Sequence, residues 1–325
     1  MSLRVGLSAV IVATIEGTPH VLATRGTGPL GLDGLPFGPF DPEGHRTFEI
    51  GLRDWVSAQT GFELGYVEQL YTFGDRGREL PTARLDGDSP ADRIISVGYL
   101  GLTPEATEID GAFDAVWRDW YRYFPWEDHS DGRPDHIIAP LCEALKNWSE
   151  CADNAAITHD RWTRVCLAFG LDDRAWIEER VLERYELLYE ANIVPEAPRD
   201  RGEGQPTDLG ERMTGTPMRS DHRRILATGM SRLRGKIKYR PVVFELMEDT
   251  FTLSALQETV EGILGVRLHK QNFRRSLEKS NFVEGTGEFE TATGGRPAER
   301  FRFRREILNE KAALGVQTPR KSNKF

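Results

Sequence analysis

The C-terminal fold is decided by residues 251–305, which read FTLSALQETVEGILGVRLHKQNFRRSLEKSNFVEGTGEFETATGGRPAERFRFRR. Apolar residues recur there at the spacing of one helical face, between Thr252, a residue type that caps helices, and Gly265, which can end a helix in a left-handed conformation. These apolar residues are Leu253, Leu256, Val260, Ile263 and Leu264. A second helix is predicted from about Lys270 to Ser280, with Phe273 and Leu277 turned inward.

The second predicted helix exposes a polar, basic face. Its outward residues are Lys270, Gln271, Asn272, Arg274, Arg275 and Lys279. Arginine and lysine can donate to guanine or phosphate, and the amides of Gln271 and Asn272 can pair with adenine. One short helix with such a face is equally compatible with plain exposure to solvent. The residues that follow it are needed to distinguish a DNA-binding helix from an ordinary surface helix.

A β-hairpin is predicted after the second helix. Phe282–Glu290 and Arg300–Arg304 alternate in strand fashion around Thr291–Pro297, where two glycines permit unusual backbone angles. The hairpin would form a wing tipped by Arg296. The second strand places guanidinium groups toward phosphate on one face and phenyl rings against the helices on the other: Arg300, Arg302 and Arg304, then Phe301 and Phe303.

A further helix is predicted around Pro241–Met247, with Val243, Phe244 and Met247 inward, and it completes a three-helix core. Three short helices followed by a basic hairpin are the outline of a DNA-binding winged helix.

The charge of the chain is divided unevenly, which fits a protein that touches nucleic acid at one end. From Arg232 to Phe325 there are 19 Lys and Arg against 12 Asp and Glu, whereas the rest holds 23 against 39. The formal net charge of the whole chain is -9. A phosphate-repelling body is thus joined to a phosphate-attracting end.

The run from Arg234 to Arg302 resembles the C-terminal winged helix of the NrtR group of Nudix-related bacterial transcription regulators. The resemblance is carried by RGKIKYRPVVFELM, FTLSALQETVEGILG, KQNFRRSLEKSNFVE and GGRPAERFRF. It implies an N-terminal Nudix-like domain that senses a nucleotide, which is ADP-ribose or an NAD-related metabolite in described members. It also implies a homodimer that binds a palindromic double-stranded DNA operator.

The N-terminal half alternates strand and helix patterns. Strands are predicted over Leu3–Thr14, Val21–Thr24, Gly65–Phe73 and Ile94–Leu102, and a helix around Phe48, Leu52, Trp55 and Val56. LGYVEQLYTFGD and RIISVGYLGL are similar to the Nudix strands that flank a variable loop in NrtR-like proteins. The expected fold class is α+β, a Nudix-like α/β/α sandwich with a helical insertion, followed by a winged helix-turn-helix domain.

A Nudix box is a Gly followed by a Glu and then an Arg-Glu-x-x-Glu-Glu helix that closes on Gly, because a metal on a diphosphate needs converging carboxylates. Aligned on Gly61 and Phe62, the arginine, the next glutamate, the paired glutamates and the upstream glutamate become Asp54, Trp55, Ala58 with Gln59, and Arg46. A shift by one residue puts Arg53 and Asp54 on the Arg-Glu pair, but the paired glutamates are then Ser57 and Ala58.

We therefore expect a Nudix fold that binds its ligand without hydrolysing it, with no catalytic residues, metal or cofactor. An altered metal site built from Glu43, Glu49 and Asp54 is the alternative. In that case the chain would be an active Nudix hydrolase of a nucleoside diphosphate derivative. Tyr71 and Arg93 are the candidates for ligand binding.

The middle of the chain is predicted to be mostly helical. An aromatic-rich helix is expected over Phe113–Trp126, with its rings in the core, followed by a turn and cap at Glu127, Asp128 and His129. Helices should continue over His136–Asn192, with Trp148, Trp162, Phe169, Leu182 and Leu187 inward. Cys142, Cys151 and Cys166 have apolar neighbours and no CxxC spacing, so buried, reduced thiols are expected.

A mobile connector is predicted over Pro195–Pro217, and a short helix over Asp221–Leu233 is the candidate for transmitting the ligand state. The expected domains are 1–150 for the sensor, 151–232 for a helical extension and linker, 233–306 for the winged helix, and 307–325 for a polar tail. The first residues lack a basic leader with a cleavage pattern and no apolar run reaches the ~20 residues of a membrane helix, so a cytoplasmic protein is expected.

Overall fold

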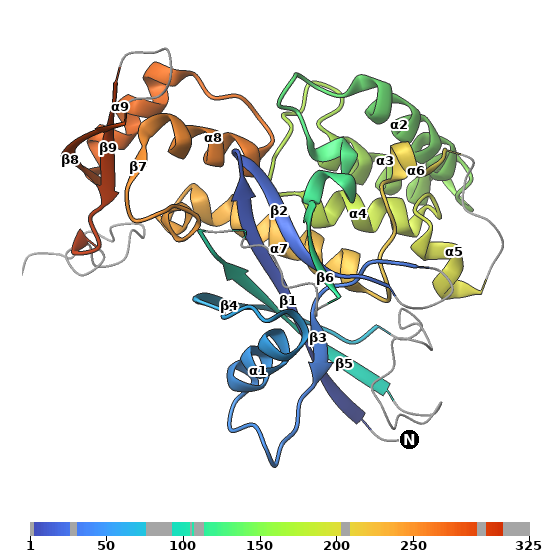
Figure 1. The fold of residues 1–325 in the computed structure, drawn as a ribbon. Helices are drawn as coiled ribbons and strands as arrows, with labels where there is room; N and C mark the ends of the chain where they lie inside the picture. Colours follow the sequence, from blue (N-terminus) through green and yellow to red (C-terminus); the bar gives the residue numbers. More distant parts are fainter. Residues whose placement is uncertain are drawn as a thin grey trace, which may run out of the picture.

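The computed structural model describes residues 3–26, 31–75, 93–104, 106, 114–202, 209–290 and 297–307. A mixed sheet lies at the centre, with α1 on one side and a group of helices on the other (Figure 1). A smaller unit of short helices and three strands lies at one end of the molecule (Figure 1). Within the described ranges no helix is long and apolar enough to cross a membrane.

The central sheet has the strand order β4-β5-β1-β2-β6, with β3 paired to β1. Its strands are β1 (Leu3–Ile15), β2 (Thr18–Thr24), β3 (Phe37–Pro39), β4 (Tyr66–Phe73), β5 (Arg93–Leu102) and β6 (Ala115–Asp119). β1 and β5 are parallel, and the other pairs are antiparallel. The four strands predicted from the sequence are confirmed.

Both faces of β1 are buried, which makes this part a three-layer sandwich. Leu7, Ala9 and Ile11 point to the face covered by α1 (Phe48–Thr60), where they join Leu52 and Val56. Val10 and Val12 point to the opposite face and belong to a second core that includes the helices. The alternation follows from the period of two along a strand.

The helices of the second layer are α2 (Asp135–Glu150), α3 (Ala155–Phe169), α4 (Val181–Glu190), α5 (Glu196–Arg201), α6 (Glu211–Thr214) and α7 (His222–Ile237). The predicted helical stretch is confirmed, with Phe169 and Leu187 buried and Trp148, Trp162 and Leu182 packed against the same core. The domain boundary expected at residue 150 falls on the last residue of α2. Buried residues before and after this position belong to the same hydrophobic core.

The prediction of one helix over Phe113–Trp126 is wrong. Its described part forms β6 and two 3₁₀ turns, η2 (Trp120–Arg122) and η3 (Pro125–Glu127). The whole of β6 pairs with residues 20–24 of β2, so hydrogen bonding to a sheet edge overrides the helical spacing of the aromatic residues. Trp120, Tyr121 and Phe124 are nevertheless buried, as expected for core residues.

Two further expectations fail in this layer. The connector predicted over Pro195–Pro217 contains α5 and α6, and Glu196 is buried there against Arg223 at 3.1 Å. This ion pair attaches the described first part of the stretch to the core. Cys166 is buried and Cys142 is half-buried, but Cys151 is exposed because it follows the last residue of α2; all three thiols are free.

α7 is the element that joins the two parts of the molecule. It packs on β1, β4 and β5, on α4, and on α8 (Leu253–Leu264). A Cβ atom at Gly229 would lie 2.9 Å from Val10 Cγ1, so the glycine lets the helix approach the sheet closely. The expected location of this helix beside both halves is confirmed, and Figure 1 shows it running from the helical layer to the smaller unit.

The smaller unit contains η4 (Val242–Leu246), β7 (Phe251–Thr252), α8, α9 (Lys270–Ser280), β8 (Val283–Glu290) and β9 (Ala298–Phe303). Its sheet has the order β7-β9-β8. The helix predicted around Pro241–Met247 is a 3₁₀ helix with Val243 and Phe244 buried. The ring of Phe244 stacks on Phe303 with centroids 4.3 Å apart, which fixes the hairpin on the helices.

Candidate nucleic-acid interface and effector domain

The two helices of the smaller unit begin and end as their sequence predicts. Thr252 Oγ1 accepts a hydrogen bond from Ala255 N at 3.1 Å, and Gly265 ends α8 with φ of 70°. α9 has no fully buried residue; Phe273 and Leu277 are half-buried against α8 and the hairpin. The predicted basic face is exposed at every position: Lys270, Gln271, Asn272, Arg274, Arg275 and Lys279. This convex, cationic helix is available to enter a major groove.

The hairpin beside α9 is also present as predicted, but its arginines differ in their contacts. Arg302 is exposed and its Nε lies 2.6 Å from Glu284 of β8. Arg300 is only partly exposed, because its Nη2 donates to Thr250 O at 2.7 Å and faces Glu248. Arg296 lies outside the described residues. The guanidinium of Arg300 therefore holds β9 against the segment before β7.

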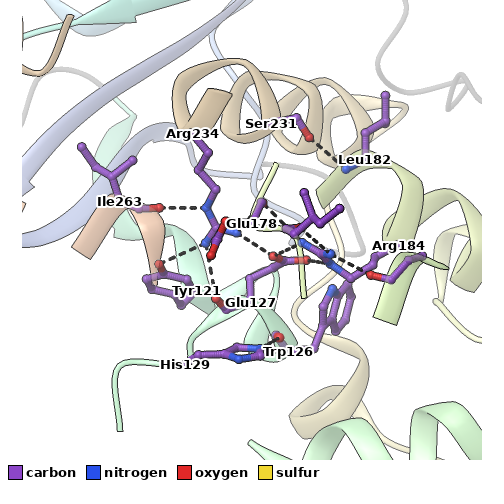
Figure 2. Close-up of polar contacts among 12 residues, drawn as sticks. Tyr121, Trp126, Glu127, His129, Glu178, Leu182, Arg184, Ser231, Arg234 and Ile263 are labelled. Carbon is purple, nitrogen blue, oxygen red and sulfur yellow. Dashed lines mark hydrogen bonds and ion pairs between the residues drawn. The ribbon is translucent and has the colours of Figure 1, made fainter. Parts of the chain in front are cut away.

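The C-terminal end of α8 is bound to the larger part of the molecule through its backbone carbonyls. Figure 2 shows Arg234 of α7 reaching the Ile263 carbonyl, with Tyr121 beside it. The hydrogen bonds are Tyr121 Oη to Gly262 O at 2.6 Å, Arg234 Nε to Ile263 O at 2.8 Å, and His129 N to Gly265 O at 2.8 Å. Carbonyls in the last turn of a helix lack partners within the helix, so these donors cap α8 from outside.

Glu127 lies at the centre of this joint, which overturns its interpretation as part of a turn and cap. Its carboxylate is fully buried and contacts Arg184 at 2.5 Å and Arg234 at 2.6 Å (Figure 2). Burial raises the pKa of the carboxyl, but the two guanidinium groups outweigh burial and hold the pKa below its usual range. Burial also raises the pKa of Tyr121 to about 12, so its hydroxyl remains a donor.

The contacts of Arg184, a partner of Glu127, explain why the sequence led to the wrong interpretation of Glu127. Arg184 stacks over Trp176 at 3.8 Å and donates to Ala168 O and Ile177 O, so its donors are shared among several elements. These partners are distant from Glu127 in the chain, and only the tertiary fold brings them together. The sequence around Glu127, Asp128 and His129 therefore could not predict the contacts of Glu127 with Arg184 and Arg234.

The helix that corresponds to a Nudix box, α1, uses its side chains to hold β3. Gln59 donates to Phe37 O at 2.6 Å and accepts from Phe37 N at 3.0 Å. Trp55 Nε1 donates to Pro39 O at 2.6 Å. Both residues occupy positions where a Nudix box has glutamate in the first register. In that register, side chains that would ligate a metal are replaced by side chains that bind the backbone of the neighbouring strand.

The remaining carboxylates of α1 are paired separately. Glu49 lies 2.8 Å from Arg53, and Asp54 lies 3.7 Å from His45. Arg53 also donates to Leu64 O and Gly65 O, which ties α1 to the chain entering β4. Among the residues that the structure describes, no group of three or more His, Cys, Asp or Glu side chains is arranged to hold a metal ion.

The two ligand-binding candidates lie on neighbouring strands. Tyr71 is on β4, with its side chain exposed and its ring 5.5 Å from that of Phe73. Arg93 begins β5 and pairs with Leu3 of β1; its side chain is outside the described set. Their roles stay predictions. The sequence predicted no ligand-binding role for the residues of a cavity at the end of β2, because Arg219 and His222 follow a segment interpreted as a connector and form no motif.

Comparison with known domains and proteins identifies the smaller unit. Residues 243–303 match the NrtR DNA-binding winged helix domain. A curated protein from Acinetobacter baylyi, the ADPR responsive transcriptional repressor NtrR, is 41% identical over 83 residues. That match covers 26% of this chain, and the chain spans only about a third (33%) of the relative's length. The expected winged helix of NrtR type is confirmed.

Comparison of folds extends over nearly the whole chain. The crystal structure of Shewanella oneidensis NrtR with a 27mer DNA superposes with a TM-score of 0.53, covering 92% of this chain and 93% of the other at 19% identity. A MutT/nudix family protein from Enterococcus faecalis gives a TM-score of 0.51, covering 94% and 87% at 15% identity. These likenesses confirm the expected architecture, a Nudix-like α+β part followed by a winged helix.

Proposed function

We propose that this chain, whose C-terminal unit is a winged helix of the NrtR type, is a ligand-responsive transcriptional regulator. The winged helix binds a double-stranded DNA operator through α9 and the hairpin. The Nudix-like part binds a nucleotide such as ADP-ribose or an NAD-related metabolite and does not hydrolyse it. The protein acts as a homodimer, so that two winged helices meet the two half-sites of a palindrome.

The observation that carries the proposal is the exposed face of α9. Six polar side chains point outward there, and Phe273 and Leu277 attach the helix to its core. Arginine, glutamine and asparagine on one helix face are suited to base edges, while lysines at either end are suited to phosphate. The exposed Arg302 on β9 supplies a second cationic element next to the helix.

Ligand binding without hydrolysis is supported by the side chains of α1. Trp55 and Gln59 hold β3, and the carboxylates of Glu49 and Asp54 are each engaged with a basic neighbour. A divalent cation on a diphosphate takes six or more oxygen ligands, several of them carboxylates. A fold that keeps its pocket and loses such ligands can still report the presence of a nucleotide.

α7 is proposed to transmit the ligand state. It begins at His222 beside the central sheet and carries Arg234, which caps α8 near its end. A displacement of the start of α7 would therefore move Arg234 and change the orientation of α8. Because packed helices move as rigid bodies, a small shift can change the spacing of two winged helices in a dimer.

The experiment that tests this function measures DNA binding and ligand turnover on the same preparation. Fluorescence anisotropy with fragments of the source genome should reveal a bound operator, with an affinity that falls as salt rises. ADP-ribose should change that affinity without being consumed in the presence of Mg²⁺. Failure to bind any fragment at modest ionic strength would refute the regulator, and Mg²⁺-dependent turnover of ADP-ribose would establish a hydrolase instead.

A further inference from the structure

A cavity of about 220 Å³ lies where β2 ends, α1 ends and α7 begins. It is lined by Thr24, Arg25, Phe37, Gln59, Arg219 and His222, among others. The lining residues come from five separate stretches of the chain. Arg219 precedes α7, and His222 is the first residue of that helix. The cavity thus joins the central sheet to the helix that reaches the winged helix.

Arg219 presents a donor with no acceptor. Its Nη2 donates to Thr24 Oγ1, whereas its Nε is buried and has no hydrogen-bond partner among the described residues. Burial lowers the pKa of the guanidinium and Asp33 opposes the shift, yet an arginine in a protein stays charged. A buried N–H without an acceptor is costly, and such groups are rare in folded proteins. This Nε lies against Gly34 and not in the cavity. The rest of the guanidinium lines the cavity and makes one hydrogen bond among the described residues, from Nη2 to Thr24, so it has donors left for an anionic group.

His222 adds a second donor. Its Nδ1 accepts a hydrogen bond from Leu35 N at 2.9 Å, so the proton of the neutral ring is on Nε2. Burial, with the charges of Arg219 and Arg199, lowers the pKa of His222 to about 3. The ring is therefore neutral at ordinary pH, and Nε2 is available as a donor rather than as a base.

The charges around the cavity favour an anion. Arg25 is exposed at its rim, and the lining carboxylate, Asp114, is exposed as well. The buried carboxylate nearby, Asp33, is already engaged by Arg118 at 3.1 Å and by the hydroxyl of Tyr123 at 3.0 Å. Among the described lining residues, Arg25 and Asp114 balance in charge, and Arg219 leaves the cavity with one positive charge in excess.

From this geometry we propose that the cavity binds a phosphoryl group of the effector, with Arg219 as the principal ligand and His222 and Arg25 as further donors. The proposal rests on the proposed function, because it names the chemistry by which the sensor recognises its nucleotide. The volume suits a phosphoryl group with an adjoining sugar and is below the roughly 300–1,000 Å³ of pockets that enclose a whole drug-sized ligand. Arginine takes over the role that a metal has in hydrolysing enzymes.

The position of Arg219 gives this binding a consequence for α7. Its backbone N–H donates to Asp33 O at 2.9 Å, and its carbonyl accepts from the N–H of His222, the first residue of the helix, at 3.1 Å. A ligand held by the guanidinium would fix this segment against the sheet. The ligand would thus add a contact between the sheet and the start of α7 to the backbone hydrogen bonds already present there.

Gly34 provides a variant that disturbs the site without removing a charge. A Cβ atom at this position would collide with the guanidinium of Arg219, and the glycine does not have a positive φ. Gly34→Ala should therefore displace Arg219 from the cavity while the backbone accepts alanine. Arg164→Gln is the matched control, since Arg164 on α3 pairs with Glu190 at the surface.

The test is isothermal titration calorimetry of the full chain with ADP-ribose and with inorganic pyrophosphate. Both probes should bind the parent protein, and Arg219→Gln and Gly34→Ala should each weaken binding about tenfold or more, as expected for loss of a hydrogen bond to a charged group. Arg164→Gln should bind both probes as the parent does. Melting temperatures, measured in parallel, identify any variant that fails to fold.

The outcomes separate this proposal from the proposed function. Parent-like affinity in folded Arg219→Gln and Gly34→Ala would overturn the site, as would a parent protein that binds neither probe. Pyrophosphate binding that depends on Arg219, without ADP-ribose binding, would uphold the site and remove ADP-ribose as the effector. Anion binding that depends on Arg219 in a protein that ignores DNA would uphold the site and refute the regulator.

Discussion

Nη1 of Arg234 lies 2.6 Å from Oε2 of Glu127, and both side chains are fully buried. Arg234 belongs to α7, the helix that joins the larger part of the molecule to the winged helix, and its Nε caps α8. One carboxylate thereby holds two arginines, Arg184 and Arg234, where the two parts meet. The orientation of α8 depends on a charge that lies outside the winged helix.

Glu127→Gln should strongly destabilise the protein, because it leaves two buried guanidinium groups without their counter-charge. Breaking a buried ion pair by removing one partner costs about 3–5 kcal/mol. Urea denaturation of the parent and the variant measures the difference. Glu190→Gln is the control, since its exposed pair with Arg164 is worth about 1 kcal/mol or less; equal losses in the two variants would contradict the prediction.

The stabilising effect of Glu127 should also depend on pH. Its pKa in the folded protein is below the ordinary value of 4.5, so the unfolded chain takes up the proton first as pH falls. The advantage of the parent over Glu127→Gln is then complete above pH 4.5 and declines below it. Denaturation at several pH values checks the sign, and an advantage that grew on acidification would be inconsistent with a salt-bridged carboxylate.

Gly262→Ala should uncouple the two parts. A Cβ atom there would collide with the carbonyl of Gly17 in the β1–β2 turn, so α8 has to move away from the sheet. We expect DNA binding to persist and the response to ADP-ribose to lose most of its coupling free energy, which is about 1–3 kcal/mol in allosteric proteins. Anisotropy titrations with and without ADP-ribose measure this quantity.

Gly235→Ala is the control for that experiment, because the nearest atom to its added Cβ is Glu179 Cγ at 3.6 Å, an ordinary contact. It should retain the full response. A Gly262→Ala protein that responded as well as this control would show that contact between α8 and the β1–β2 turn is not needed for coupling.

Arg275→Ala should weaken operator binding by about 1–3 kcal/mol if its guanidinium reads a base, and the loss should vary with operator sequence. Lys279→Ala, in the last turn of α9, should weaken all DNA alike and reduce the salt slope by about one unit, as for a phosphate contact. Anisotropy at several salt concentrations distinguishes them. A uniform loss for Arg275→Ala would reassign that residue to the phosphate backbone.

His222→Asn should flatten the acid dependence of stability. The folded pKa of about 3 is below the ordinary 6.5, so between these values the unfolded chain binds a proton that the folded chain does not. Because of this residue, the free energy of unfolding should fall by about 1.4 kcal/mol for each unit by which the pH is lowered within that window. Asparagine keeps an acceptor for Leu35 N but does not titrate. Identical slopes for parent and variant would argue against a buried neutral imidazole.

The winged helix could be predicted residue by residue because its signals are local. Thr252 and Gly265 cap α8, and the alternation of arginine and phenylalanine in β9 sets one face against the helices. In the central sheet, β1, β2, β4, β5 and the covering helix α1 could be predicted for the same reason, since periods of two and 3.6 residues are visible within a single element.

Only the tertiary structure decided the parts that depend on partners distant in the chain. β6 is a strand because β2 offers it an edge, although its aromatic residues have helical spacing. Glu127 is buried because Arg184 and Arg234 reach it from 57 and 107 residues away. The cavity with Arg219 and His222 forms where five stretches of chain meet. The local sequence determines those elements whose signals lie within them, whereas the strand β6, the burial of charges and their pairing are set by the way the elements pack.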